Sequence, residues 1–264
     1  MRTALIGWSG FVGSNIAAAR SFDALYNTSN IDEIRGQEFD LVVSAAARAD
    51  SHRINADGAR DRAEIDDYVD LLETVKIGRL VLASTVCIYP GGTTPDESTP
   101  LSEEGLTPYG ANRLHMERRL SDAFDLLPVR LPQLYGRGIK KGIVYDLMND
   151  YRVEFIRPEG LFQYYDLRRL WSDTQRALDA GIDSLNIATP AITSADIAQE
   201  VFGRDISGQE FDTPENPLSR MYTRDMRTEH ASLYGGPDGY LMSRQESLDA
   251  VRSFVVEARA GNDA

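Results

Sequence analysis

The sequence predicts an α/β protein built on a doubly wound parallel sheet, with a small second lobe toward the C-terminus. Short apolar segments alternate with longer amphipathic segments through much of the 264-residue chain, which is the pattern of repeated βαβ units. Several of the short segments are apolar at every position, as in strands that helices cover on both faces. A glycine-rich turn directly follows the first of these segments.

Regularly spaced strands and helices make up this pattern. The expected strands are Thr3–Ile6, Ala24–Tyr26, Leu41–Ser44, Leu80–Ala83, Leu126–Arg130 and Leu185–Ile187. The expected helices between them are Val12–Arg20, Ala59–Val75, Pro108–Ala123 and Ser172–Ala180. Because crossovers between parallel strands are right-handed, we expect these helices to cover the two faces of the sheet.

The alternation becomes irregular after about Gly138, where Pro and Gly residues interrupt the chain more often. The helices expected in this region are Ile143–Tyr151, Ser194–Phe202 and Ser243–Ala258. We therefore predict one domain of residues 1–137, with residues 166–190 packing back on its sheet. Residues 138–165 and 191–264 are expected to form the smaller lobe.

The charge of the chain limits its partners. It has 28 Lys and Arg residues against 41 Asp and Glu residues, which gives a formal net charge of −13. Such a surface repels phosphate backbones and anionic lipid headgroups, so we expect neither nucleic acid nor a membrane as a partner. The N-terminal residues resemble a strand that enters a turn rather than a secretory signal, and no apolar run approaches the ~20 residues that cross a bilayer. A cytoplasmic location is expected.

The cysteine and histidine residues offer no metal site. A single cysteine excludes an internal disulfide framework and a cysteine-rich zinc module. The three histidines, His52, His115 and His230, are scattered and form no paired ligand set. We interpret them as structural residues.

The turn after the first strand has the spacing G-x-x-G-x-x-G. Glycines at such a turn let the backbone approach a pyrophosphate, whose charge then lies at the free N–H groups of the following helix. A strand-to-helix turn also uses glycine for purely steric reasons. The position after the first strand favours dinucleotide binding. The predicted cofactor-binding residues of this turn are Gly7, Trp8, Ser9, Gly10, Phe11, Val12 and Gly13.

The end of the second strand does not decide between NAD and NADP. An acidic residue there would accept hydrogen bonds from the ribose and repel a 2′-phosphate, but the chain has Asn27 followed by Thr28 and Ser29. This favours NADP weakly, yet no arginine stands nearby to bind the phosphate. Asn27 is predicted to contact the cofactor, and the choice stays open.

A second group of candidates lies at the end of the fourth strand and at the start of a helix. Thr85 ends the strand, and Thr107 and Pro108 are typical of a helix N-cap and first turn. Tyr109 and Arg113 then lie one turn apart on the same helix face. Because a fixed cation lowers the pKa of a neighbouring tyrosine, we expect Tyr109 to act as an acid or base near neutral pH.

These motifs resemble those of the extended short-chain dehydrogenase/reductase family, in particular its NAD(P)-dependent nucleotide-sugar epimerase/dehydratase branch, which has a Rossmann fold. The matching pieces are Gly7/Gly10/Gly13, Ala45-Ala46-Ala47, Ser84-Thr85…Tyr89, Tyr109-Gly110, Arg130-Leu131-Pro132…Tyr135-Gly136 and Leu185-Asn186-Ile187. They follow the order of the family over roughly the first two-thirds of the chain.

The resemblance implies roles for several of these residues. It implies that Thr85 and Tyr109 hold the substrate hydroxyl whose carbon exchanges hydride with nicotinamide. The cofactor-contacting residues that it implies are Ala45, Ala46, Ala47, Tyr109, Arg113 and Leu131. A homodimer through the helices Ala59–Val75 and Pro108–Ala123 is common in the family and is expected here on that ground alone.

The main departure from the family is Arg113, which stands where the family has lysine. That lysine contacts the nicotinamide ribose, lowers the tyrosine pKa and joins a proton path to solvent. Arginine keeps the charge but does not release a proton. Two interpretations follow. Arg113 suits a cycle in which the hydride leaves and returns, since Tyr109 then recovers its own proton, or the protein binds dinucleotide without catalysing a reaction.

Cys87 and a lysine pair are candidate proton-transfer groups. The segment that ends Cys87-Ile88-Tyr89-Pro90 resembles that of GDP-fucose synthases and GDP-mannose epimerases, in which the cysteine exchanges protons next to a keto group. Alternatively, Cys87 is a small buried apolar residue. Lys140 and Lys141 fall near the second acid/base group of those epimerases. They could equally attract the substrate diphosphate or be solvated charges.

The resemblance also locates the nucleotide half of the substrate. The residues that it assigns to substrate binding are Lys140, Lys141, Gln163 and Arg224. The neighbouring Tyr164 and Tyr165 could stack on a base or pack within a strand, and Arg224 and Arg227 could bind a diphosphate or pair with Asp225 or Glu229. The smaller lobe is accordingly interpreted as substrate-binding.

We therefore expect an NAD(P)-dependent oxidoreductase or isomerase acting on a nucleotide-activated sugar. Epimerisation through a transient keto intermediate is favoured, and Cys87 joins Thr85, Tyr109 and Arg113 as a candidate catalytic residue. The alternatives are a net NAD(P)H-dependent 4-ketosugar reductase and a non-catalytic dinucleotide-binding sensor.

Overall fold

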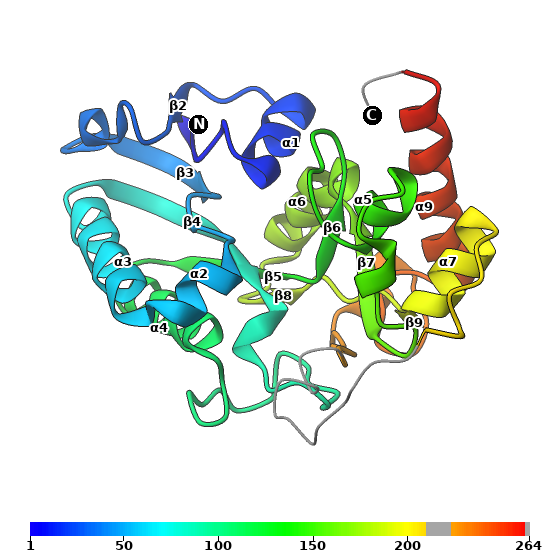
Figure 1. Cartoon of the computed structure of the whole chain (residues 1–264). Helices are drawn as coiled ribbons and strands as arrows, with labels where there is room; N and C mark the ends of the chain where they lie inside the picture. The colour runs from blue at the N-terminus through cyan, green and yellow to red at the C-terminus, as the bar shows by residue number, and fades with distance from the viewer. Residues whose placement is uncertain (210–222, 262–264) are drawn as a thin grey trace. The chain divides into compact units, whose positions relative to one another are not determined.

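The computed structural model describes residues 1–209 and 223–261 of the chain. They form two compact units, which Figure 1 shows in the colours of the chain. The first unit contains Met1–Tyr89, Pro100–Arg130 and Leu170–Leu185, and the second contains residues 90–99, 131–169 and the described part of 186–264. Residues 210–222 and 262–264 of the predicted lobe lie outside the described residues.

The division between the units differs from the predicted boundaries at residues 90–99, 131–137, 166–169 and 186–190. Glu97 explains the first difference. Its carboxylate accepts hydrogen bonds from the backbone N–H of Asn186 and from the Thr228 hydroxyl, both at 2.7 Å. This loop is thereby bound to the second unit, although its neighbours in sequence belong to the first.

A six-stranded sheet forms the centre of the fold, with the strand order β2-β1-β3-β4-β5-β8. The strands are β1 (Thr3–Ile6), β2 (Ala24–Tyr26), β3 (Glu38–Ser44), β4 (Lys76–Thr85), β5 (Leu126–Leu131) and β8 (Leu185–Asn186). β1 pairs in parallel with both β2 and β3, and β3 pairs in parallel with β4. This confirms the predicted doubly wound parallel sheet. β3 and β4 start earlier than predicted, because the ladder continues through the exposed pair of Glu38 and Lys76.

Helices cover this sheet on both faces (Figure 1). They are α1 (Phe11–Ala19), α2 (Ser51–Ala56), α3 (Gly58–Leu72), α4 (Pro108–Ala123) and α6 (Leu170–Ala180). α3 packs against α4, and α1 packs against α6, where Arg20 lies 4.5 Å from the centroid of the Trp171 ring. Fully buried side chains such as Val42, Val69 and Leu80 fill the space between the sheet and α3.

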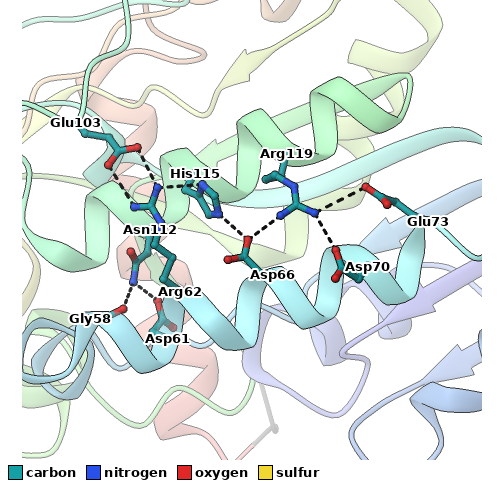
Figure 2. A network of polar contacts seen from close by, with 10 residues as sticks. All are labelled: Gly58, Asp61, Arg62, Asp66, Asp70, Glu73, Glu103, Asn112, His115 and Arg119. Atoms are coloured by element: carbon teal, nitrogen blue, oxygen red, sulfur yellow. Dashed lines mark hydrogen bonds and ion pairs between the residues drawn. The ribbon is translucent and has the colours of Figure 1, made fainter.

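Polar residues of α3 and α4 pair with one another within the chain, as Figure 2 shows. Arg119 of α4 lies 2.8 Å from both Asp66 and Asp70 of α3. His115 lies between Arg62 and Asp66 and belongs to the same network, in keeping with its structural interpretation. The homodimer across these helices stays a prediction.

The second unit has a three-stranded sheet of β6 (Gln133–Tyr135), β7 (Leu161–Asp166) and β9 (Ala191–Thr193). β7 pairs in parallel with β6 and antiparallel with β9. The surrounding helices are α5 (Ile143–Met148), α7 (Ser194–Phe202), α8 (Ala231–Tyr234) and α9 (Arg244–Arg259). Within the part of the chain that the structure describes, no helix is both long and apolar enough to span a membrane.

Candidate active site

The glycine turn connects β1 to α1 as predicted. The fold requires its three glycines to different degrees. Gly7 has a positive φ of +82°, and a Cβ there would lie 2.5 Å from the carbonyl oxygen of Ala45. A Cβ on Gly13 would overlap the backbone of Gly7. Both glycines are therefore required by the packing of the fold itself. A Cβ on Gly10 would meet only the Gly7 oxygen, at 3.3 Å, so the fold requires this glycine far less.

The start of α1 is open to a ligand. Gly10 is its N-cap residue and supplies no side chain to bond the first N–H groups of the helix. Trp8, Ser9 and Gly10 are exposed, and Phe11 and Val12 are half-buried. The backbone N–H of Ala45 donates to Ile6 at 2.9 Å, which holds Ala45–Ala47 beside the turn. Leu131 is buried at the end of β5.

Asn27 lies directly after β2 and connects the strand to the turn. Its side-chain oxygen accepts hydrogen bonds from the Ser29 backbone and hydroxyl, at 2.9 and 2.6 Å. Its amide nitrogen reaches the Ser9 hydroxyl at 3.4 Å. The two loops that the sequence assigned to the cofactor are thus bonded to each other.

The first turn of α4 is fixed by neighbours on two sides. The Thr107 hydroxyl accepts a hydrogen bond from the Gly110 N–H at 3.3 Å, which confirms the predicted N-cap. The side-chain oxygen of Asn55 on α2 accepts the N–H of Tyr109 at 2.9 Å. A Cβ on Gly110 would overlap the carbonyl oxygen of Cys87. Glycine here lets α4 approach the segment that carries Cys87.

Thr85 and Cys87 lie at the end of β4 and in the short 3-10 helix η2 (Val86–Ile88) that follows it. The Thr85 hydroxyl accepts the N–H of Cys87 at 3.2 Å, and both side chains are half-buried. Cys87 is a free thiol. Thr85, Cys87 and Tyr109 therefore form one cluster within the first unit, since Thr85 and Cys87 both influence the Tyr109 hydroxyl electrostatically.

The protonation of Tyr109 differs from the expectation. Its pKa is raised, mainly because burial disfavours the phenolate, and the nearby Cys87 raises it further. Arg113 and the contact with Thr85 act in the opposite direction, but they do not compensate for burial. The prediction of a lowered pKa is therefore wrong for this structure, and Tyr109 is a protonated acid at neutral pH.

Arg113 lies beside Tyr109 but is already paired with a carboxylate. Its guanidinium carbon is 5.0 Å from the centroid of the Tyr109 ring. Two of its nitrogens bind the carboxylate of Asp61, at 2.9 and 3.2 Å, and one also donates to the Arg48 carbonyl oxygen at 2.9 Å. Arg113 and Asp61 are only 3% and 6% exposed, and the Nε of Arg113 is buried without a partner.

The sequence analysis missed Asp61. One signal could have found it, because an arginine buried on the inner face of α4 needs a carboxylate from the helix that packs there. Asp61 lies in the first turn of that helix, α3. Figure 2 shows Asp61 receiving a further hydrogen bond from Asn112 of α4, at 2.9 Å.

A second buried ion pair lies one turn further along the same face of α4. Glu117 accepts three hydrogen bonds from Arg130 of β5, at 3.0 to 3.3 Å. It also accepts the hydroxyl of Ser84, the neighbour of Thr85, while Arg130 reaches the Tyr89 hydroxyl at 2.6 Å. This pair ties α4, the end of β4 and the residue after η2 together.

The second unit has a cavity of about 310 Å³ whose lining includes Lys141. Other residues at this cavity are Asp146, Tyr151, Arg152, Phe155 and Arg157. Tyr151 and Phe155 are largely exposed, and the Arg152 guanidinium lies 4.8 Å from the centroid of the Phe155 ring. Basic and aromatic side chains gather here on a chain that is acidic as a whole. Lys140 is exposed nearby in sequence.

Gln163 lies inside the second unit rather than at a surface. Its side-chain amide donates to the backbone oxygens of Thr189 and Met226, and its oxygen accepts the Met226 N–H at 2.8 Å. The residue is 1% exposed. These bonds use the amide within the fold, which corrects the expectation that Gln163 faces the substrate.

The other candidates of the second unit are either packed within the fold or paired with a carboxylate. Tyr164 and Tyr165 are buried on β7, which favours strand packing over stacking on a base. Arg227 pairs with Asp225 at 3.0 Å. The backbone N–H of Arg224 donates to Leu161 at 2.9 Å, and its side chain is half-buried.

Comparisons with known proteins agree with this geometry. The model of a family described as the NAD dependent epimerase/dehydratase family matches residues 21–153. This range includes Thr85, Cys87, Tyr109 and Arg113 and begins after the glycine turn. A search of curated protein sequences found no significant match.

Solved structures match over nearly the full length of both chains. A UDP-glucose 4-epimerase of Thermotoga maritima with UDP-glucose has a TM-score of 0.76 at 14% identity, covering 99% of each chain. A dTDP-4-dehydrorhamnose reductase of Clostridium acetobutylicum has a TM-score of 0.74 at 13% identity, covering 98% of this chain and 100% of that one. A UDP-glucuronic acid 4-epimerase variant of Bacillus cereus, in complex with NAD and a fluorinated UDP-sugar, has a TM-score of 0.70 at 14% identity, with 98% and 100% coverage. At these identities the matches establish the fold.

Proposed function

Because the chain belongs to the NAD dependent epimerase/dehydratase family, we propose that it binds NAD(P) and acts on a nucleotide-activated sugar. The reaction that we favour is epimerisation through a transient keto intermediate. The observation that carries this proposal is the cluster of Tyr109, Thr85 and Cys87 in the first unit, beside a guanidinium that cannot release a proton.

The residues of the first unit fit a dinucleotide. Gly10 leaves space at the uncapped start of α1, where N–H groups suit a pyrophosphate. The buried, unpartnered Nε of Arg113 suits a ribose hydroxyl. Ala45–Ala47 and Asn27 complete the proposed contacts of this unit, and Leu131, which belongs to the second unit, stays a proposed contact. The residues directly after β2, Asn27, Thr28 and Ser29, include neither the carboxylate that favours NAD nor an arginine that favours NADP, so both cofactors belong in the assay.

A bound nicotinamide supplies the hydride acceptor and donor of the proposed reaction. Only the phenolate form of Tyr109, which is the minor form at neutral pH because its pKa is raised, takes the proton of the substrate hydroxyl. The Thr85 hydroxyl holds the same oxygen by a hydrogen bond. Arg113 stays protonated throughout and gives Tyr109 no proton exchange with solvent. The proton therefore remains on Tyr109 until the keto oxygen is reduced again, which suits a cycle that returns its hydride.

Cys87 is the proposed second proton-transfer group. A keto group acidifies the neighbouring C–H bonds, and a thiol with a pKa near 8.5 in its unperturbed state exchanges protons with such carbons. The half-buried thiol of Cys87 lies in the same cluster as Tyr109 and Thr85. Epimerisation at the adjacent carbon would use this group.

The cavity of the second unit is proposed to bind the nucleotide diphosphate. Lys141, Arg152 and Arg157 offer positive charge to the phosphates, and Tyr151 and Phe155 offer exposed rings to a base. Lys140 and Arg224 remain proposed contacts. The structural matches that carry UDP-sugars support this class of substrate.

Replacement of Tyr109 by Phe tests the function. The variant and wild type are incubated with UDP-, dTDP- and GDP-sugars and with each cofactor, and the products are identified by NMR. We expect turnover to fall at least about 100-fold while the Kd for the cofactor stays unchanged, because the hydroxyl acts only in proton transfer. Tyr145→Phe on α5 is the matched control. Wild-type binding of cofactor without turnover of any sugar would instead indicate a dinucleotide-binding sensor.

A net 4-ketosugar reductase is the second candidate, and the raised pKa of Tyr109 favours it. A phenol that stays protonated at neutral pH is ready to donate to a keto oxygen. The similarity to dTDP-4-dehydrorhamnose reductases supports this alternative as well. Stoichiometric consumption of NAD(P)H with a 4-ketosugar would identify a reductase, whereas an epimerase leaves the total reduced cofactor constant.

A further inference from the structure

The carboxylate of Asp61 on α3 is bound by two side chains of α4. It accepts two hydrogen bonds from the guanidinium of Arg113 and one from the amide of Asn112. Asn112 in turn donates to the backbone oxygen of Gly58 at 2.7 Å (Figure 2). The carboxylate is 6% exposed and is therefore held in one position from several sides.

We propose that Asp61 is a positioning residue of the reaction, which fixes the Arg113 guanidinium beside the Tyr109 ring and offsets part of its positive charge. This inference rests on the proposed function and adds to it a residue that touches neither substrate nor cofactor. Lysine would not form the same arrangement, because its single nitrogen cannot present two parallel N–H donors to the two carboxylate oxygens as the planar guanidinium does. The pairing gives arginine a specific reason to stand at this position.

The groups around Tyr109 show why the charge that Arg113 presents to the phenol affects its pKa. Cys87 faces it from η2, Thr85 from β4 and Arg113 from α4, while Asp61 of α3 lies behind Arg113. The backbone N–H of Tyr109 is bonded to the neutral Asn55 side chain of α2. An unpaired Arg113 would favour the phenolate strongly in this buried setting.

Arg48 contacts Arg113 through its backbone alone and contributes no side chain to the pairing. Its guanidinium lies 3.4 Å from the carboxylate of Glu64, and only its backbone oxygen contacts Arg113. Asp61 is thus the carboxylate that the structure pairs with Arg113. Removal of this one negative charge should return the phenol of Tyr109 toward the lowered pKa that a free cation produces.

Asp61→Asn is the test, with Asp67→Asn as the matched control on the exposed side of the same helix. The phenol is titrated by NMR in protein carrying ring-labelled tyrosine, and the Tyr109 signal is assigned by its loss in Tyr109→Phe. We expect Asp61→Asn to lower the pKa of Tyr109 by about one unit or more and Asp67→Asn to leave it unchanged. Asp61→Glu should restore most of the wild-type value.

The double variant Asp61→Asn with Arg113→Gln covers the case in which Asp61→Asn does not fold. It removes both charges together, so the pKa of the Tyr109 phenol should stay at least as high as in wild type, because the lowering influence of Arg113 is lost with its partner. A fall of about a full unit in the double variant would overturn the proposal, as would a folded Asp61→Asn protein with an unchanged Tyr109 titration. The titration needs no turnover, so its result stands apart from the success of the proposed function.

The pH profile of turnover gives a second measurement. In an active enzyme, Asp61→Asn should shift the limb governed by Tyr109 toward lower pH, with the Kd for cofactor changed less than kcat. A loss of kcat without any shift of the profile would indicate a merely structural role for Asp61 and would contradict the proposal.

Discussion

Glu117 on α4 binds Arg130 on β5 through three hydrogen bonds, and both side chains are about 95% buried. The pair lies two turns after Tyr109 on the face that also carries Arg113. It connects the helix of the candidate acid to the strand end of Thr85 through Ser84. The position of the candidate cluster of Thr85, Cys87 and Tyr109 thus depends on a buried ion pair outside it.

Glu117→Gln should destabilise the protein by about 3–5 kcal/mol, because it leaves Arg130 as an uncompensated buried cation. Urea unfolding measures the loss. Glu104→Gln is the control, since Glu104 is exposed and should change the free energy of unfolding by no more than about 0.5 kcal/mol. Equal free energies of unfolding for the two variants would contradict this prediction and would mean that water solvates Arg130.

Gly10→Ala and Gly13→Ala should have different effects. A Cβ at position 13 overlaps the backbone of Gly7, so this variant should lose stability by about 1–3 kcal/mol. A Cβ at position 10 meets little of the protein, and Gly10 has an ordinary φ of −81°. Gly10→Ala should therefore fold normally and weaken NAD(P) binding instead. Thermal unfolding and calorimetric titration separate the two effects, and unaltered binding in Gly10→Ala would contradict the proposed cofactor site.

The ionised carboxylate of Asp66 should stabilise the fold near neutral pH and lose this contribution in strong acid. A hydrogen bond from His115 is the main cause that holds the pKa of this carboxyl below its usual value. A depressed folded-state pKa contributes stability that is present above the unfolded pKa of about 3.9 and is lost as the pH falls through the folded value. Asp66→Asn should thus be less stable than wild type near neutral pH and equal to it in strong acid. Urea midpoints measured across pH test this, and Asp67→Asn should show no such dependence.

Cys87→Ala should uncouple two steps of the proposed reaction. If the thiol exchanges the proton next to the keto group, epimerisation should fall by about 10²–10⁴-fold while cofactor affinity and hydride transfer persist. Incorporation of solvent deuterium into the recovered sugar should fall in parallel. Unchanged deuterium incorporation would assign Cys87 to packing, the alternative that its half-buried position also allows.

The sheet and the start of α4 could be predicted because their signals are local. β1, β2 and α4 have the bounds that the sequence predicts, since each is a short apolar run or a helix with Thr107 and Pro108 at its start. The short strands β6 and β9 carry no comparable signal and were not predicted. Gln163 was misjudged for the same reason, because its partners Thr189 and Met226 are distant in sequence.

The charge pairing around Tyr109 could not be predicted from spacing. Asp61 and Arg113 are 52 residues apart, and an aspartate in the first turn of a polar helix is typical of a solvated face. The raised pKa of Tyr109 follows mainly from burial, and the pairing is proposed to contribute to it. The resemblance to the family named Thr85, Tyr109 and Arg113 as candidates, but the sign of the pKa shift of Tyr109 required the packed structure.

The proposal that the cavity of the second unit binds a diphosphate has a consequence for how such a ligand would arrive. A dianionic ligand is repelled at a distance by a chain of net charge −13 and attracted only within about 8 Å of Lys141, Arg152 and Arg157 at physiological ionic strength. Added salt weakens the repulsion and the attraction together. Ligand capture should therefore vary little with ionic strength, and its speed would be governed by random collision instead of long-range guidance.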